Sequence, residues 1–200
     1  VKVESHHFDI RKHLVEYDDV VNTHRTIVYG ERDKALGDSD LKANIQAMIE
    51  EQLQLVLDAH LADQAPRNWD TESLLREVSA ILPPPDDLSD PDVLAEMPAQ
   101  QIEEGIQSHA RRLYEAMEEE IEPERMRSVE RQVMLRAIDS NWVQHLTSME
   151  NLRQGIGLQA YGQRDPLVMY KSTGHELFQA LQDNIRRNVV QTVFHVSVTP

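Results

Sequence analysis

The sequence contains no cysteine, and this absence excludes disulfide bonds and zinc sites that depend on thiolate ligands. Aromatic residues make up only 5% of the chain, and the 7 glycines and 9 prolines leave long stretches without a helix breaker. Most candidate core residues are Leu, Ile, Val and Met, which suit packing between helices better than packing between sheets. Together these features predict an all-α fold.

Membrane-spanning and targeting segments are also missing from the sequence. No apolar run approaches the roughly 18 residues that a membrane-spanning helix requires. The opening residues, Val-Lys-Val-Glu, form neither a signal peptide nor a natural start, so we expect the chain to be part of a longer protein.

Negative charge is concentrated in the middle of the chain. The formal charge is -15, of which residues 63–122 carry -12, residues 1–62 carry -5 and residues 123–200 carry +2. Coulomb repulsion keeps such an acidic segment away from nucleic acid and anionic lipid. We therefore expect no nucleic-acid partner, and a solvated acidic surface is the simplest interpretation of residues 63–122.

Apolar residues recur at spacings of three and four, which is the period of an α-helix. The longest unbroken pattern runs from about residue 124 to residue 156 and predicts a helix about 45 Å long. The β-branched run 189–198 is compatible with an extended end of the chain. The predicted helices cover residues 8–28, 41–60, 74–81, 102–117, 124–156 and 166–196.

Capping residues and breakers divide the first two thirds of the chain. Asp38 or Ser39 is expected to cap the second helix, and Asp70 or Thr71 the short third helix. Three consecutive prolines begin the segment 83–98, and their missing N–H donors exclude a helix there. We therefore expect residues 83–98 to be a linker or an irregular loop.

The last third contains its own break. Gly155, Gly157 and Gly162 are expected to loosen the chain after the long helix. Asp165 then provides an N-cap, and Pro166 occupies the first helical position, where proline is well tolerated. The pattern predicts two long antiparallel helices joined by a glycine-bearing tip.

Candidate catalytic groups occur in the sequence without the context that their chemistry needs. There is no phosphate-binding loop, and Gly155-Ile156-Gly157 lacks the third glycine and the preceding strand of a dinucleotide site. Asp139, His145 and Ser148 lie close together, but on a helix whose N–H groups are already bonded there is no oxyanion hole. We therefore expect no catalytic residue in this chain.

Metal sites are also poorly supported. The pair Asp18-Asp19 is similar to the magnesium-binding motif of helical isoprenoid synthases, but a solvated helix face explains it better. His6 and His7 are adjacent and would face different directions on a helix. None of the nine histidines has the spacing of a zinc site.

Two blocks of residues are more specific than any of these fragments. The first block is residues 8–22, Phe-Asp-Ile-Arg-Lys-His-Leu-Val-Glu-Tyr-Asp-Asp-Val-Val-Asn. The second block consists of Val133-Met134-Leu135, Asp139, Trp142, His145-Leu146, Met149, Leu152-Arg153-Gln154-Gly155-Ile156, Leu158, Tyr161, Gln163, Asp165-Pro166 and Tyr170-Lys171. Both blocks, in their residues, order and separation, resemble the carboxy-terminal half of SecA, the ATP-driven motor of bacterial protein export.

The resemblance implies a domain organisation. Residues 1–62 and 123–200 would form the helical scaffold domain, which consists of one long helix and a terminal two-helix finger. Residues 63–122 would form the inserted helical wing, an assignment that rests on position alone. The nucleotide-binding domains, the preprotein cross-linking domain and the cysteine-rich zinc tail of the family are missing from this sequence. ATP and Mg²⁺ would therefore bind to the full-length protein outside this chain.

The resemblance also implies roles for single residues. The segment 156–166 corresponds to the fingertip, where Tyr161, with Leu158 and Gln163 beside it, would contact the translocating polypeptide. An exposed tyrosine offers a sequence-tolerant contact, although a tyrosine that packs its own loop remains an alternative. The helices that restrain the ATPase would carry Trp142, Leu146, Met149 and Arg153, and the scaffold strut would carry Phe8, Arg11, Tyr17 and Asp18.

The implied partners are the rest of SecA with its nucleotide-binding domains, the SecYEG channel and the preprotein. The implied location is the cytoplasm, with peripheral association with the inner membrane. Excision from the motor would expose apolar surface and promote self-association. A stand-alone helical adaptor that binds partners through its grooves is the alternative function.

Overall fold

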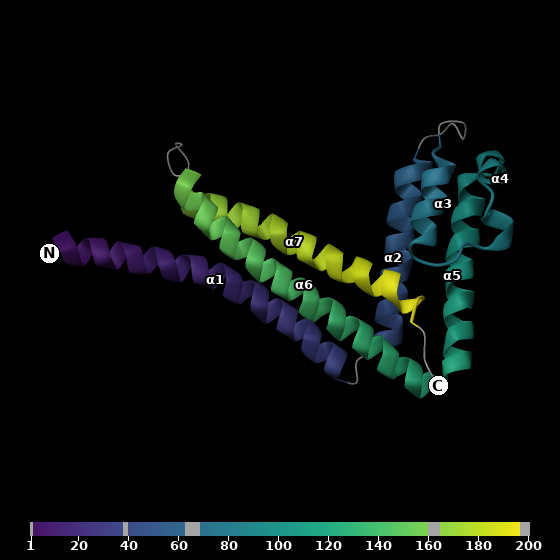
Figure 1. The fold of residues 1–200 in the computed structure, drawn as a ribbon, viewed down its shortest axis with the longest axis horizontal. Coiled ribbons are helices and arrows are strands. Elements are labelled where there is room, and N and C mark those ends of the chain that lie inside the picture. Colours follow the sequence, from purple (N-terminus) through teal and green to yellow (C-terminus); the bar gives the residue numbers. More distant parts are fainter. Residues whose placement is uncertain (1, 38–39, 63–68, 160–164, 197–200) are drawn as a thin grey trace. The chain divides into compact units, whose positions relative to one another are not determined.

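The computed structural model describes residues 2–37, 40–62, 69–159 and 165–196, without the side chains of residues 2–14 and 157–159. Within these ranges every regular element is helical and no strand occurs, so the predicted all-α fold is confirmed. The elements are α1 (Lys2–Leu36), α2 (Leu41–Leu61), α3 (Thr71–Ser79), the 3₁₀ helix η2 (Asp86–Leu88), α4 (Pro91–Glu96), α5 (Ala99–Ile121), α6 (Pro123–Gln159) and α7 (Pro166–Val193) (Figure 1).

The chain divides into two compact units. The first unit comprises residues 1–37 and 135–185, and the second comprises residues 38–134 and 186–200. These units are defined by contacts between residues, so they do not test the domain boundaries predicted after residues 62 and 122. Those boundaries remain a prediction.

The first unit consists of three long helices. Figure 1 shows α6 and α7 running side by side in opposite directions within it, as the sequence predicted. An isolated helix is only marginally stable in water, so these helices depend on burying their apolar stripes against one another. The buried residues of this unit include Val28, Ala35, Ile138, Trp142, Met149, Ile156, Tyr170, Phe178 and Leu181.

The second unit contains α2, α3, α4 and α5, together with the start of α6 and the end of α7. Along α2 the buried residues follow a spacing of four, which places them in one row on the helix surface. Met48, Val56 and His60 also follow the helical spacing of apolar and weakly polar residues along α2, but they are only partly buried. The buried row of α2 is Leu41, Ile45, Ile49, Leu53, Leu57 and Leu61.

The segment 83–98 is not the linker that its prolines suggested. The three prolines are non-helical as expected, but η2 and α4 follow them, with Pro91 at the start of α4. Leu88 and Leu94 are 2% and 0% exposed and belong to the core of the second unit. The prediction failed because proline was treated as a breaker, whereas at the first position of a helix it fits the helical backbone.

Gly105 of α5 lies against this buried segment. A Cβ atom at position 105 would come within 2.6 Å of Cδ1 of Leu88, which is too buried to swing aside. We expect Gly105→Ala to lower the free energy of unfolding by about 1 kcal/mol, since overpacking outweighs the gain in helix propensity. Gly30→Ala is the control, because a Cβ atom at position 30 meets nothing within 4 Å and should stabilise by about 0.5–1 kcal/mol. Urea denaturation of both variants tests this opposite sign, and equal effects would contradict it.

The helix starts agree only partly with the sequence. Asp40 caps α2, because its side chain accepts from the backbone N–H of Ala43 at 3.2 Å. The cap predicted at Asp38 or Ser39 is therefore wrong, and both of those residues lie outside the described ranges. Asp70 caps α3 as predicted, and hydrogen bonds from Ser73 lower the pKa of its carboxyl.

The starts and ends of α6 and α7 lie within three residues of the predicted ones. Asp165 accepts from the backbone N–H of Leu167 at 2.9 Å and begins α7 as expected. By contrast, α6 continues through Gly155 and Gly157, so the predicted loosening at those two positions is wrong. α7 ends at Val193, three residues before the predicted end at residue 196, so the first part of the β-branched run 189–198 is helical. Glycine within a helix costs only about 1 kcal/mol, which packing of the surrounding helix readily offsets.

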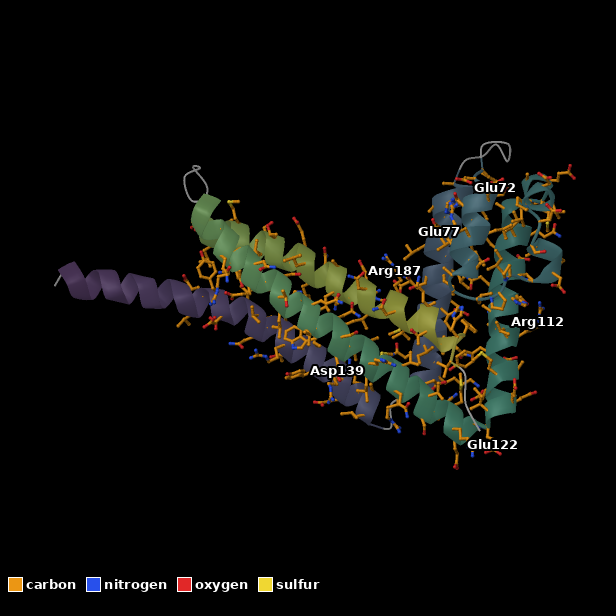
Figure 2. All side chains as sticks on the ribbon, viewed as in Figure 1. Glu72, Glu77, Arg112, Glu122, Asp139 and Arg187 are labelled. Carbon is orange, nitrogen blue, oxygen red and sulfur yellow. The ribbon has the colours of Figure 1, made fainter. Side chains whose placement is uncertain are left out.

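The surface of the second unit is acidic. Glu72 and Glu77 of α3 and Glu122 after α5 are exposed (Figure 2). Glu122 has a φ of 75°, which lets α5 end and α6 begin one residue later. No helix in the described ranges combines the length and the apolar character that crossing a membrane requires.

Candidate functional site

The first unit joins α1 to the α6–α7 pair through an aromatic cluster. The rings of Tyr17 and Tyr170 meet edge to face, with their centroids 4.7 Å apart. Tyr170 is 1% exposed and packs in one cluster with Met149 and Ile156, which are also buried. Burial raises the pKa of both tyrosines, so both stay neutral at physiological pH. The cluster is an uncharged, well-packed contact between α1, α6 and α7.

A groove of about 340 Å³ opens beside this cluster. On its rim Arg153 lies 2.8 Å from Glu150 and 3.9 Å from Asp18, which connects α6 to α1. These side chains are largely exposed, so the ion pairs contribute little stability. The lining residues are Asp18, Val21, Asn22, Arg25, Leu146, Met149, Glu150, Arg153 and Tyr170.

Three further contacts join α1 to α6. Nε of Arg32 donates to Oδ1 of Asp139 at 3.1 Å, and Figure 2 labels Asp139 on α6. His24 and His145 lie 3.1 Å apart between Nδ1 and Nε2, and both are buried. Trp142 is also buried, and its ring lies 6.3 Å from that of Tyr29.

The second unit contains a buried ionic network of its own. Glu130 of α6 is 0% exposed and accepts from the hydroxyl of Tyr114 of α5 and, at 2.7 Å, from Nη2 of Arg127. The same Arg127 donates to Glu118 at 2.6 Å, and Lys42 of α2 also pairs with Glu118. Burial raises the pKa of Glu130, and burial with the nearby carboxylate raises the pKa of Tyr114. The network ties α2, α5 and the start of α6 together.

Comparison of the chain with known protein families identifies the family to which it belongs. The family model described as the SecA Wing and Scaffold domain matches residues 1–197. The chain belongs to the SecA wing and scaffold family. The predicted resemblance to SecA is therefore confirmed.

Three curated relatives, each named protein translocase subunit SecA, agree with the family. The protein of Dehalococcoides mccartyi is 44% identical over 197 residues, which are 98% of this chain and 21% of the relative. That of Pelotomaculum thermopropionicum is 39% identical over 98% of this chain and 22% of its own length. That of Gloeobacter violaceus is 38% identical over 97% of this chain and 21% of its own length. The chain thus spans about a fifth of the length of these relatives.

The structure brings together most of the residues that the resemblance to SecA assigned to the scaffold. Asp18 of the predicted strut lines one groove together with Leu146, Met149 and Arg153 of the predicted regulatory helices. Tyr17 packs against the cluster beside that groove. Trp142 lies among the residues that join α1 to α6. The roles that the resemblance implies for these SecA residues remain predictions.

The remaining SecA positions are not described at the side-chain level. Tyr161 and Gln163 of the predicted fingertip lie outside the described residues. Leu158 belongs to α6 and Phe8 and Arg11 belong to α1, but their side chains are outside the described part. The expected contact with polypeptide therefore stays a prediction for all three fingertip residues.

Sequence reasoning missed two buried contacts in this chain. The pairing of His24 with His145 was not predicted, although both histidines fall within the apolar pattern of their helices. Glu130 was not singled out, yet Met126 and Met134 flank it at a spacing of four and are buried. A polar residue on a buried helical row was the available signal.

Among the described residues there is no group of three or more side chains able to hold a metal ion.

Proposed function

We propose that this chain is the non-catalytic wing and scaffold part of a SecA-type preprotein translocase ATPase. In that role it couples ATP-driven movement of the motor to the passage of polypeptide through the SecYEG channel. ATP and Mg²⁺ bind to nucleotide-binding domains elsewhere in the full-length protein. The membership in the SecA family and the names of its relatives support this proposal.

The observation that carries the coupling role is the repeated attachment of α1 to the α6–α7 pair. Contacts occur at Tyr17, His24 and Arg32, which span about 22 Å of α1 at the usual helical rise. A helix held at three levels moves with its neighbours as one body, because packed interfaces do not deform continuously. A displacement of α1 is therefore passed on to the α6–α7 pair.

Regulation and location belong to the same proposal. We infer that the α6–α7 pair restrains the ATPase through contacts with the nucleotide-binding domains, and that the fingertip reaches the preprotein. The protein would work in the cytoplasm, bound peripherally to the inner membrane at SecYEG. The excised chain would expose the apolar surface that faces the motor and would self-associate.

The fingertip provides the test of this function. In the full-length protein, Tyr161→Ala should slow preprotein translocation about fivefold, the factor that corresponds to an aromatic contact worth about 1 kcal/mol. Basal ATPase activity should change little, because the substitution lies outside the nucleotide site. Translocation into SecYEG-containing vesicles and ATP hydrolysis are measured on the same preparation.

Tyr161→Phe is the matched control for this experiment. It keeps the apolar ring and removes only the hydroxyl, so it should retain most of the translocation rate. Wild-type translocation by Tyr161→Ala would argue against a contacting fingertip. A complete absence of ATP-dependent translocation by the unmodified full-length protein would reject the proposed function itself.

A further inference from the structure

Two histidines from different helices meet inside the first unit. Nδ1 of His24 in α1 lies 3.1 Å from Nε2 of His145 in α6. The two side chains are 6% and 4% exposed. Phe178 of α7 stacks on His24 with its centroid 4.3 Å away, and Trp142 stacks on His145 at 5.5 Å. The pair therefore occupies the point where α1, α6 and α7 meet.

The direction of the hydrogen bond between the rings depends on which nitrogen of each ring carries the proton. Burial lowers the pKa of His145, and a hydrogen bond with the backbone of Leu177 offsets part of this shift. That offset is expected when the carbonyl of Leu177 accepts from the other ring nitrogen of His145, Nδ1. If Nδ1 of His145 carries the proton, its Nε2 is the acceptor and Nδ1 of His24 is the donor. A proton added to Nε2 of His145 would remove that acceptor and break the bond.

The surroundings oppose a positive charge on either ring. Burial, followed by the electrostatic effects of His145 and His175, lowers the pKa of His24 to about 4. Burial also lowers the pKa of His145. His145 of α6 and His175 of α7 are thus the titratable groups whose electrostatic effects disfavour a proton on His24. The closed arrangement requires both central rings to be neutral.

We propose that His24 and His145 form a proton-sensitive latch that holds α1 on the α6–α7 pair. When both rings are neutral, the hydrogen bond and the stacked rings keep the helices together. Opening exposes the rings to water, where they bind protons more readily, so opening takes up protons and acid promotes opening. The relevance of this latch to translocation rests on the proposed function, whereas the latch itself does not.

The direction of the pH effect follows from the depressed pKa values. The closed state has its full advantage above about pH 6.5, the ordinary value for histidine, and loses it as the pH falls toward about 4. Within this window the ratio of open to closed molecules should rise about tenfold per pH unit for each proton taken up.

The test measures the separation of α1 and α6 in the full 200-residue chain. Because the sequence has no cysteine, Thr26→Cys and Gln144→Cys place spin labels at two unique exposed sites. Electron paramagnetic resonance should give one short distance at pH 7.5 and a growing long-distance population between pH 6.5 and pH 4.5, with helical circular dichroism retained. An unchanged distance over this range would overturn the proposal.

Matched variants separate the latch from general acid effects. The double variant His24→Gln with His145→Gln keeps a hydrogen-bonded amide pair that cannot be protonated, and it should lose the response. His175→Gln should keep it. A wild-type response in the double variant would overturn the proposal. NMR on the unsubstituted chain gives a second measurement. Scalar coupling across the hydrogen bond between Nδ1 of His24 and Nε2 of His145 should be present at pH 7.5. It should disappear over the same pH range in which the spin-label distance grows. Absence of this coupling at pH 7.5 would also reject the latch.

Discussion

Replacing Arg127 with methionine should lower the free energy of unfolding by about 3–4 kcal/mol, because it leaves the carboxylate of Glu130 buried without its cation. Glu130 is 0% exposed, and Nη2 of Arg127 lies 2.7 Å from its Oε1. The remaining partner of that oxygen is the hydroxyl of Tyr114, a neutral donor. One neutral hydrogen bond does not balance the removal of a charge from water.

The size of this loss has a natural ceiling. Glu130 can take up a proton, and neutralising a carboxyl of ordinary pKa at pH 7 costs about 3–4 kcal/mol. The penalty in Arg127→Met should therefore shrink as the pH falls toward 5, where the proton is more readily available. Urea denaturation at both pH values checks the magnitude and the sign.

Two further variants complete the experiment on the ionic network. Adding Glu130→Gln to Arg127→Met removes both charges and should recover most of the lost stability. Arg125→Met is the matched control, because Arg125 is exposed and lies two residues before Arg127. It should change the free energy of unfolding by less than about 0.5 kcal/mol. If Arg127→Met changed the free energy of unfolding as little as Arg125→Met does, Glu130 would not be held as a buried charge.

The helices of this protein were predictable because their signals are local. The residue spacing predicted α2, α5, α6 and α7 within a few positions, and the absence of cysteine and long apolar runs was sufficient to exclude several other fold classes. The segment 83–98 was harder to predict, since Leu88 and Leu94 are isolated apolar residues among prolines and acids. Their burial depends on α5 and α3, which no local pattern reveals.

The contacts between helices were not predictable from spacing. His24 and His145 are separated by 121 positions, and nothing in the periodicity of α1 says which face of α6 it meets. The aromatic pair of Tyr17 and Tyr170 is likewise nonlocal. The resemblance to SecA supplied the residues of the scaffold, but their pairing required three-dimensional geometry.

Tyr170→Ala should have an effect as large as the loss of Arg127, for a different reason. The ring is 1% exposed and fills the space between α1 and the α6–α7 pair, so its removal should cost about 3–5 kcal/mol. Tyr170→Phe keeps the ring and removes only the hydroxyl, and we expect a change below about 1.5 kcal/mol. Urea denaturation of both variants distinguishes loss of packing from loss of a polar group.

A double-mutant cycle tests whether this ring attaches α1. Tyr17→Ala and Tyr170→Ala should show a coupling energy of about 0.5–1.5 kcal/mol, the value expected for an edge-to-face pair at 4.7 Å. Zero coupling would mean that Tyr170 stabilises only the α6–α7 pair. If the coupling is present, Tyr170→Ala in the full-length protein should reduce translocation more than ATP hydrolysis. This comparison is made at a temperature at which the variant remains folded. A loose joint between α1 and the α6–α7 pair would let the motor move without carrying the fingertip with it.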